Sequence, residues 1–216
     1  MGVKLQFSMM KTYGVFSSCY LPPAEYFYYL LQQPEAIIDI HENFVKQSHR
    51  NRCTILSPNG ALNLVIPILK KGKSTRFKDV KIAYYENWQK THWKSIEAAY
   101  RSSPYFEYYE DDLKPLFLEN KPELLLDFNF LLFEQLLTLL NIDVKYSKSD
   151  CYIENVANPI DYRKINPKIK PHLDFPEYIQ VFSDKTGFVP NLSIIDLLFN
   201  EGPNAKNYLL NSMKTH

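Results

Sequence analysis

The sequence predicts an α/β fold, with a single mixed-sheet domain, an N-terminal β-hairpin region and a largely helical C-terminal half. Short β-prone runs fill the first third of the chain, and Asn59-Gly60 between two apolar runs is a strong hairpin signal. From Glu86 onward, apolar residues recur with the period of a helix. The 216 residues contain no linker-like stretch, so we expect one core.

We expect residues 1–10 to form a disordered or non-native N-terminal extension, because structured sequence begins at Lys11. Residues 11–216 are then expected to form the single domain.

The first third of the chain is expected to supply the strands. A β-prone run covers Tyr13–Tyr20, and a helix is expected over Ala24–Gln33, because the preceding proline fits the first turn of a helix. We expect the central sheet to hold three apolar runs: Ile37–Ile40, Thr54–Leu56 and Leu62–Ile68. Phe77–Tyr84 alternates well enough to predict a further strand.

Helices are expected to dominate the remainder of the chain. The apolar periods predict helices over three segments: Glu86–Arg101, Tyr105–Phe117 and Glu123–Leu140. Tyr178–Phe182 returns to strand character. Ser193 and Asp196 match a capping box at the start of a later helix, which gives Asp196 a structural role.

The composition narrows the functional class. The chain carries 25 Lys and Arg against 24 Asp and Glu, so its net charge of +1 gives no field that would recruit nucleic acid or an anionic membrane. No stretch predicts a membrane span. The three cysteines are far apart and lack metal-ligand spacing, which indicates reduced thiols in a cytoplasm and no metal site. A nucleophilic Cys19 or Cys53 is conceivable, but nothing in the sequence indicates a lowered thiol pKa.

The polar stretch from His41 to Cys53 is the first candidate site. It lies between two apolar runs and therefore predicts a loop at the end of a sheet, where binding and catalytic groups tend to lie. We expect His41 and His49 to act as acid or base. We expect an anionic or sugar ligand to be bound by four residues of this loop: Lys46, Arg50, Asn51 and Arg52. A solvated connection between strands explains the composition equally well.

The predicted helices supply the second group of candidates. His92 lies on an apolar aromatic face, three residues from Gln89, and is the third candidate acid or base. Further ligand-binding candidates are Tyr20, Trp88, Gln89 and Asn129. A lone histidine on such a face is more often a satisfied core residue, and Asn129 finds backbone partners more often than a ligand. We expect Arg50, Asn51 and Arg52 to approach His92 and to line one cleft with it.

Taken in order, the chain resembles the WbqC-like protein family. The resemblance covers nearly the whole chain from Tyr13, and it rests on these residues: Tyr20-Leu21-Pro22, Tyr26-Phe27, Asn51-Arg52, Asn59-Gly60, Trp88, His92, Tyr100, Pro104-Tyr105-Phe106, Asp127-Phe128-Asn129, Tyr178, Gln180 and the run from Leu192 to Gly202.

The resemblance implies a bacterial cytoplasmic protein of surface-polysaccharide (O-antigen) biosynthesis. It further implies transfer of an acyl or aminoacyl group to an amino sugar or a similar anionic metabolite. Two departures bear on activity: Ser17-Ser18 replaces a Gln-Pro pair, and Ile40-His41 replaces paired aspartates. The alternative is a non-catalytic small-molecule-binding or assembly protein that uses the same cationic cleft. The sequence specifies neither a cofactor nor an oligomeric state.

Overall fold

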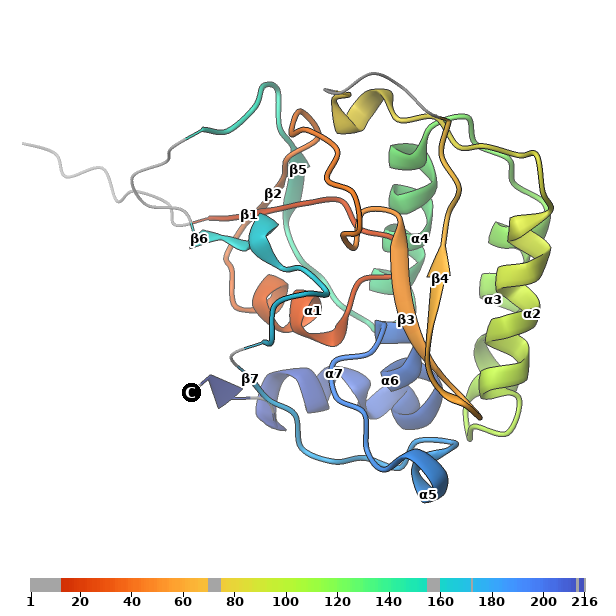
Figure 1. Ribbon diagram of the computed structural model, residues 1–216. Coiled ribbons are helices and arrows are strands. Elements are labelled where there is room, and N and C mark those ends of the chain that lie inside the picture. The colour runs from red at the N-terminus through yellow and green to blue at the C-terminus, as the bar shows by residue number, and fades with distance from the viewer. Residues whose placement is uncertain (1–12, 70–74, 155–159, 172, 213, 216) are drawn as a thin grey trace, which may run out of the picture.

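A four-stranded parallel sheet forms one side of the molecule (Figure 1). The computed structural model describes residues 13–69, 75–154, 160–171, 173–212 and 214–215. The sheet order is β5-β2-β1-β6, and its strands are β1 (Gly14–Phe16), β2 (Ala36–Ile38), β5 (Tyr146–Lys148) and β6 (Ile160–Asp161). All three pairings are parallel, with Val15 opposite Ile37 and Asp161, and Ile37 opposite Ser147. The carboxyl ends of the four strands therefore meet at one edge of the sheet.

Helix α1 (Ala24–Leu31) joins β1 to β2 and lies close to the predicted boundaries. Its rings pack against helix α4 (Leu125–Leu139), with the Phe27 and Phe133 centroids 6.1 Å apart. Phe133 also meets Tyr146 of β5 edge-on at 5.3 Å. An aromatic core thus joins the parallel sheet to the helical layer.

The predicted hairpin is confirmed, but it does not join the parallel sheet. Strands β3 (Arg52–Ser57) and β4 (Gly60–Val65) form a separate two-stranded antiparallel sheet that turns at Asn59 and Gly60. The expectation of one central sheet holding all three apolar runs is wrong in this respect. An Asn-Gly turn fixes only the local pairing, whereas the sheet that β2 joins depends on residues more than 100 positions away.

The predicted strand over 77–84 is also absent. Phe77–Asp79 forms the 3₁₀ turn η1, and beyond it only the isolated bridges of Lys81 and Ile82 are extended pairings. The alternating pattern therefore marked buried positions, such as Val80 and Ile82, that do not lie in a strand.

Three long helices form the other side of the molecule, as predicted (Figure 1). They are α2 (Trp88–Tyr100), α3 (Phe106–Leu118) and α4. In the view of Figure 1 the hairpin is drawn between α1 and the pair formed by α2 and α3. The apolar face of α2 is buried as expected, including His92 and Trp93, and Asp127 and Glu134 of α4 are exposed.

The C-terminal region closes the core with short elements. They are η2 (Tyr162–Lys164), β7 (Leu173–Asp174), α5 (Ser183–Thr186), α6 (Ile194–Glu201), η3 (Gly202–Asn204), α7 (Ala205–Asn207), the π-turn η4 (Tyr208–Ser212) and β8 (Lys214–Thr215), which pairs with β7. The predicted strand over 178–182 is absent: residues 178–180 are irregular and residues 181–182 form a turn.

The predicted capping box is wrong as well. The Ser193 hydroxyl donates to the carbonyl oxygen of Leu21 at 2.9 Å and not to the start of its own helix. Asp196 is fully buried and accepts hydrogen bonds from the Tyr100 hydroxyl at 2.9 Å and the Tyr178 hydroxyl at 2.6 Å. The structural role of Asp196 is confirmed, but its carboxylate joins α6 to the segments that carry Tyr100 and Tyr178 and does not take part in a capping box.

Gly202 offers a test of this packing. Its φ is +54°, and a Cβ placed there would lie 2.5–2.7 Å from ring atoms of Tyr105. We expect Gly202→Ala to lower the free energy of unfolding by about 2–4 kcal/mol in a denaturant melt, from backbone strain and overpacking together. Gly60→Ala is the control, because Gly60 also has a positive φ of +96° but no atom lies within 4 Å of its added Cβ. Equal losses for both variants would contradict the packing argument.

Candidate functional site

Eight of the eleven predicted site residues lie around the start of the β3–β4 hairpin. We call them the hairpin cluster: Tyr20, His49, Arg50, Asn51, Arg52, Trp88, His92 and Asn129. They come from the segment after β1, from the polar loop, and from α2 and α4.

Backbone and side-chain contacts join the members of this cluster. The backbone N–H of Tyr20 donates to the carbonyl oxygen of His49 at 2.8 Å. The amide of Asn129 donates to the carbonyl oxygen of Arg50 at 2.9 Å, which buries the end of the polar loop against α4. The Asn51 amide donates to the carbonyl oxygen of Ile66 at 2.9 Å and ties the loop to the residue after β4. The polar loop is therefore an ordered part of the core.

His92 is held on both sides of its ring. Its Nδ1 lies 2.9 Å from the Tyr20 hydroxyl, and it also has a hydrogen bond to the backbone of Val65. Burial lowers the pKa of His92 to about 4, so the ring is neutral at pH 7. Val65 is the strand partner of Arg52, so the structure brings this end of the loop close to His92, while the cleft that they were expected to line together stays a prediction.

The pKa of His49 is similar to that of His92, but one ring nitrogen of His49 has no hydrogen-bond partner among the described residues. Burial lowers its pKa to about 4; a hydrogen bond to the backbone of Arg52 opposes the shift, and the charges of Arg52 and Arg50 add to it. Its Nδ1 is buried and has no hydrogen-bond partner among the described residues. A neutral imidazole that donates to a backbone oxygen through one nitrogen retains a lone pair on the other. His49 can therefore accept a proton or a hydrogen bond.

Arg52 is the cation of this cluster that is left without an acid. It is half-buried at the start of β3, on the opposite face of the strand from the buried Cys53. Within the described part of the chain it forms no ion pair, and its buried Nε has no hydrogen-bond partner. A guanidinium in this state is suited to a carboxylate or phosphate.

Two further polar atoms of the cluster are buried without a partner among the described residues, namely Trp88 Nε1 and Asn129 Oδ1. Trp88 meets His92 edge-on at 5.1 Å and Phe128 at 5.5 Å. Buried polar atoms normally find partners, so each of these is a place where a ligand or ordered water would be stabilised.

The three remaining predicted site residues lie outside the cluster. His41 is half-buried, and its backbone N–H donates to Asp39 at 3.0 Å. Lys46 is exposed on the loop. The Gln89 amide donates to the carbonyl oxygen of Asn120, which fixes it to the end of α3. Their predicted roles stay predictions.

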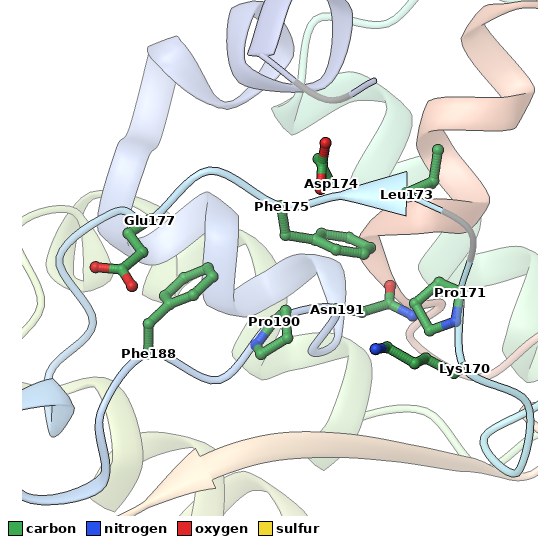
Figure 2. Close-up of a pocket in the computed structure, with 9 residues that line it drawn as sticks. All are labelled: Lys170, Pro171, Leu173, Asp174, Phe175, Glu177, Phe188, Pro190 and Asn191. Carbon is green, nitrogen blue, oxygen red and sulfur yellow. The ribbon is translucent and has the colours of Figure 1, made fainter. Parts of the chain in front are cut away.

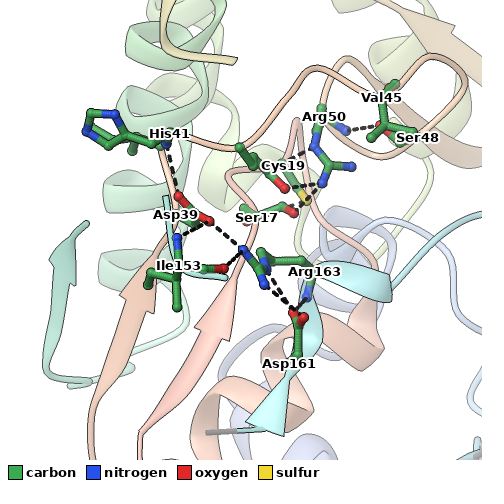
Figure 3. A network of polar contacts seen from close by, with 12 residues as sticks. Ser17, Cys19, Asp39, His41, Val45, Ser48, Arg50, Ile153, Asp161 and Arg163 are labelled. Atoms are coloured by element: carbon green, nitrogen blue, oxygen red, sulfur yellow. Dashed lines mark hydrogen bonds and ion pairs between the residues drawn. The ribbon is translucent and has the colours of Figure 1, made fainter. Parts of the chain in front are cut away.

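Arg50 is bound within the protein. Its guanidinium donates to both carboxylate oxygens of Glu42, at 2.8 Å from Nε, and to the Ser17 hydroxyl at 2.8 Å. Glu42 is 5% exposed and Arg50 is 4% exposed. Burial raises the pKa of Glu42, and the Arg50 hydrogen bond and charge oppose that rise. Arg50 thus stabilises the loop, with Ser17 at the end of β1 as its third contact (Figure 3).

A second arginine, which the sequence reasoning missed, closes the carboxyl edge of the parallel sheet (Figure 3). Arg163 donates to Asp39 at 2.5 Å, to Asp161 at 2.9 Å and to the carbonyl oxygen of Ile153 at 2.8 Å. Its hydrogen bonds lower the pKa of Asp161. Asp39 directly follows the apolar run of β2, and this position of an acid is visible in the sequence. In the structure its side chain is fully buried. The partner arginine of Asp39 lies 124 residues later, and no sequence pattern indicated it.

The two buried thiols, Cys19 and Cys53, do not suit covalent catalysis. Burial raises the pKa of Cys19 to about 12 and also raises that of Cys53, so both remain protonated at neutral pH. The described residues contain no group of three or more His, Cys, Asp or Glu arranged to hold a metal ion. No described helix has the length and apolarity that a membrane crossing requires.

Comparison with known proteins places the sequence of this chain in a family. The model of the WbqC-like protein family matches residues 17–160 and 161–208, a range that includes every predicted site residue. The chain is also similar to the uncharacterized protein Rv1507c of Mycobacterium tuberculosis, with 26% identity over 229 residues that cover 93% of this chain and 98% of that protein. No solved structure matches the chain.

The Glu42–Arg50 pair gives a stability prediction. Glu42→Gln leaves a buried guanidinium without a counter-charge, so we expect a loss of about 3–5 kcal/mol in the free energy of unfolding. Glu97→Gln is the matched control, because Glu97 pairs with Arg101 on the surface, where both side chains are more than a third exposed. We expect its denaturation midpoint to stay within error of the parent protein. A similar midpoint for Glu42→Gln would show that the buried pair does not stabilise the loop.

The two histidines predict a pH dependence of stability. Unfolded histidine has a pKa near 6.5, whereas His49 and His92 protonate only near pH 4 in the native state. Between these values the unfolded chain binds more protons, so stability falls as the pH falls from 6.5 to 4. Each ring should contribute on the order of 2 kcal/mol over this range. The contribution is measured as the difference between urea melts of the parent and of His49→Gln or His92→Gln at several pH values. Profiles that stay parallel would contradict it.

Proposed function

The chain belongs to the WbqC-like protein family, and from this premise we propose that it is a group-transfer enzyme with its site at His49 and Arg52. Its substrate is an anionic metabolite such as an activated amino sugar, to which it transfers an acyl or aminoacyl group. This activity fits a cytoplasmic step of surface-polysaccharide biosynthesis.

One observation carries the proposal. Among the described residues, His49 Nδ1 and Arg52 Nε have no hydrogen-bond partner, they lie on one short segment, and the charge of Arg52 acts on the His49 ring. The neighbouring Arg50 is neutralised by Glu42, so the positive charge available to a ligand is that of Arg52. Arg52 would hold the phosphate or carboxylate of the substrate through charge-assisted hydrogen bonds.

His49 would then act on the amine of the acceptor. The amine nitrogen attacks the carbonyl carbon of an activated ester or thioester, and a C–N bond forms. The bond from that carbon to the leaving oxygen or sulfur breaks, and the leaving group departs with the electron pair. The nitrogen loses a proton, which Nδ1 of His49 accepts.

Ligand charge would adjust the basicity of His49. A ring with a pKa near 4 is a weak base at pH 7. An anion bound at Arg52 would offset the arginine charges and favour the protonated ring, which raises the pKa of His49 toward the working range. The site would therefore gain its base when the substrate is bound.

The second candidate function is non-catalytic binding or assembly through the same residues. The internal pairing of Arg50 and the protonated state of both buried thiols favour it, because they remove one predicted clamp and two nucleophiles. Binding without turnover by the intact cluster would support this candidate.

The test is ligand-dependent thermal stability. We expect nucleotide sugars to raise the melting temperature of the parent protein, and Arg52→Ala to lose most of that rise because the charge-assisted contacts are removed. The unliganded Arg52→Ala protein should melt close to the parent, since Arg52 has no ion pair within the described residues.

Arg76→Ala is the charge-matched control, because Arg76 is exposed and outside the hairpin cluster. It should keep the response, apart from a small weakening at low salt. His49→Asn should retain binding but lose transfer of the acyl group in a product assay with an acyl thioester. An unliganded Arg52→Ala protein that is strongly destabilised, with unchanged relative affinity, would make Arg52 a structural residue and refute the proposal.

A further inference from the structure

A preformed pocket lies on the C-terminal part of the chain, away from every predicted site residue (Figure 2). Its volume is about 460 Å³, within the range of small-molecule sites. Two groups of residues form its walls: the first is Lys170, Pro171, Leu173, Asp174, Phe175 and Glu177, and the second is Phe188, Pro190 and Asn191.

The first wall is fixed by the core and by a tyrosine. Leu173 is 5% exposed, and Leu173 and Asp174 pair with β8. The Tyr208 hydroxyl donates to the carbonyl oxygen of Pro176 at 2.7 Å, which holds the backbone on the C-terminal side of Phe175.

The second wall is fixed by the network around Asp196. The Gln180 side chain forms two hydrogen bonds of 2.9 Å with the backbone of Val189, and it donates to Asp196 at 3.0 Å. Asn191 exchanges two hydrogen bonds with Glu25, one to its backbone at 3.0 Å and one to its carboxylate at 2.8 Å. Both walls are therefore positioned before any ligand binds, which reduces the entropy lost on binding.

The lining combines flat apolar groups with one inward-pointing cation. The rings of Phe175 and Phe188 turn toward the space between the walls, with Pro190 beside them (Figure 2). The ammonium group of Lys170 also points inward, whereas the Asp174 carboxylate points to the opposite side of its strand. Lys170 has no ion pair within the described residues.

From this arrangement we infer that the pocket is a second ligand site, for a small molecule with a flat ring and an anionic group. The ring packs between Phe175 and Phe188, and the carboxylate or phosphate of the ligand pairs with Lys170. Glu177, at the Phe188 end, repels an anion placed there and so sets the direction of the ligand.

Phenyl phosphate is a suitable probe because it carries both features. Backbone amide NMR of the isotope-labelled full chain should show saturable shifts at the non-proline residues of 173–177 and 188–191 during titration. Inorganic phosphate lacks the ring and benzyl alcohol lacks the charge, so each should bind at least about tenfold more weakly, a difference of about 1.4 kcal/mol.

Two variants and a control assign the contacts. Phe188→Leu keeps the apolar volume but removes the flat ring, and it should weaken phenyl phosphate about fivefold. Lys170 is exposed, so Lys170→Glu leaves the core intact. It should weaken the binding of phenyl phosphate by a similar factor, and the loss of affinity should be larger at low salt. Lys168→Glu makes the same charge change on an exposed lysine that does not line the pocket, and it should leave affinity within twofold.

Three results of the titration would overturn the inference. They are no pocket shifts up to about 10 mM probe, equal binding of inorganic phosphate, or shifts confined to the β3–β4 hairpin. It is also overturned if Lys170→Glu and Lys168→Glu reduce affinity equally, since that would indicate general surface charge.

Discussion

The buried ion pair between Glu42 and Arg50 is the interaction on which the rest of the structure depends. The polar loop leaves the parallel sheet after β2 and enters the hairpin at β3, so it must cross the core while carrying charged and amide side chains. Each charge would cost several kcal/mol to bury alone. Pairing them, with Ser17 as a further donor and acceptor, lets the loop lie inside. Once it lies there, the backbone of His49 and Arg50 becomes available to Tyr20 and Asn129.

This arrangement separates two kinds of arginine that look alike in the sequence. Arg50 and Arg52 are two residues apart and would be expected to share a role. In the structure, Arg50 stabilises the fold through its pair with Glu42, and the Nε of Arg52 at the start of β3 has no partner among the described residues. Arg163 at the sheet edge resembles Arg50, because it forms ion pairs with Asp39 and Asp161 inside the protein. The carboxyl edge of a parallel sheet is the usual ligand site of α/β folds. Here Arg163, Asp39 and Asp161 at this edge neutralise one another. The buried polar atoms without a partner among the described residues lie mostly in the hairpin cluster instead.

Sequence patterns over a few residues correctly predicted the elements that depend on contacts between near neighbours in the chain. The helical periods located α2, α3 and α4 within a few residues, and the Asn59-Gly60 turn located the hairpin, because both depend on neighbours a few positions away. The parallel sheet was out of reach, since β5 and β6 are short and pair with strands more than 100 residues earlier. The candidate site followed the same rule. Its residue types were visible in one loop, whereas Glu42 as the partner of Arg50 required a fold in which both are buried.

The two departures from the family pattern fall at the ends of β1 and β2, where the sheet edge is sealed. Ser17 contacts Arg50 through its hydroxyl, and His41 follows Asp39, whose carboxylate accepts from Ser149 and Arg163. Both substitutions therefore lie in contacts that position the loop, while four atoms of the cluster, on His49, Arg52, Trp88 and Asn129, have no partner in the part of the chain that the structure describes. A change at the sheet edge can alter the stability of the loop without changing the chemistry of the hairpin cluster. On this argument, the departures affect how firmly the site is held, and activity depends on His49 and Arg52.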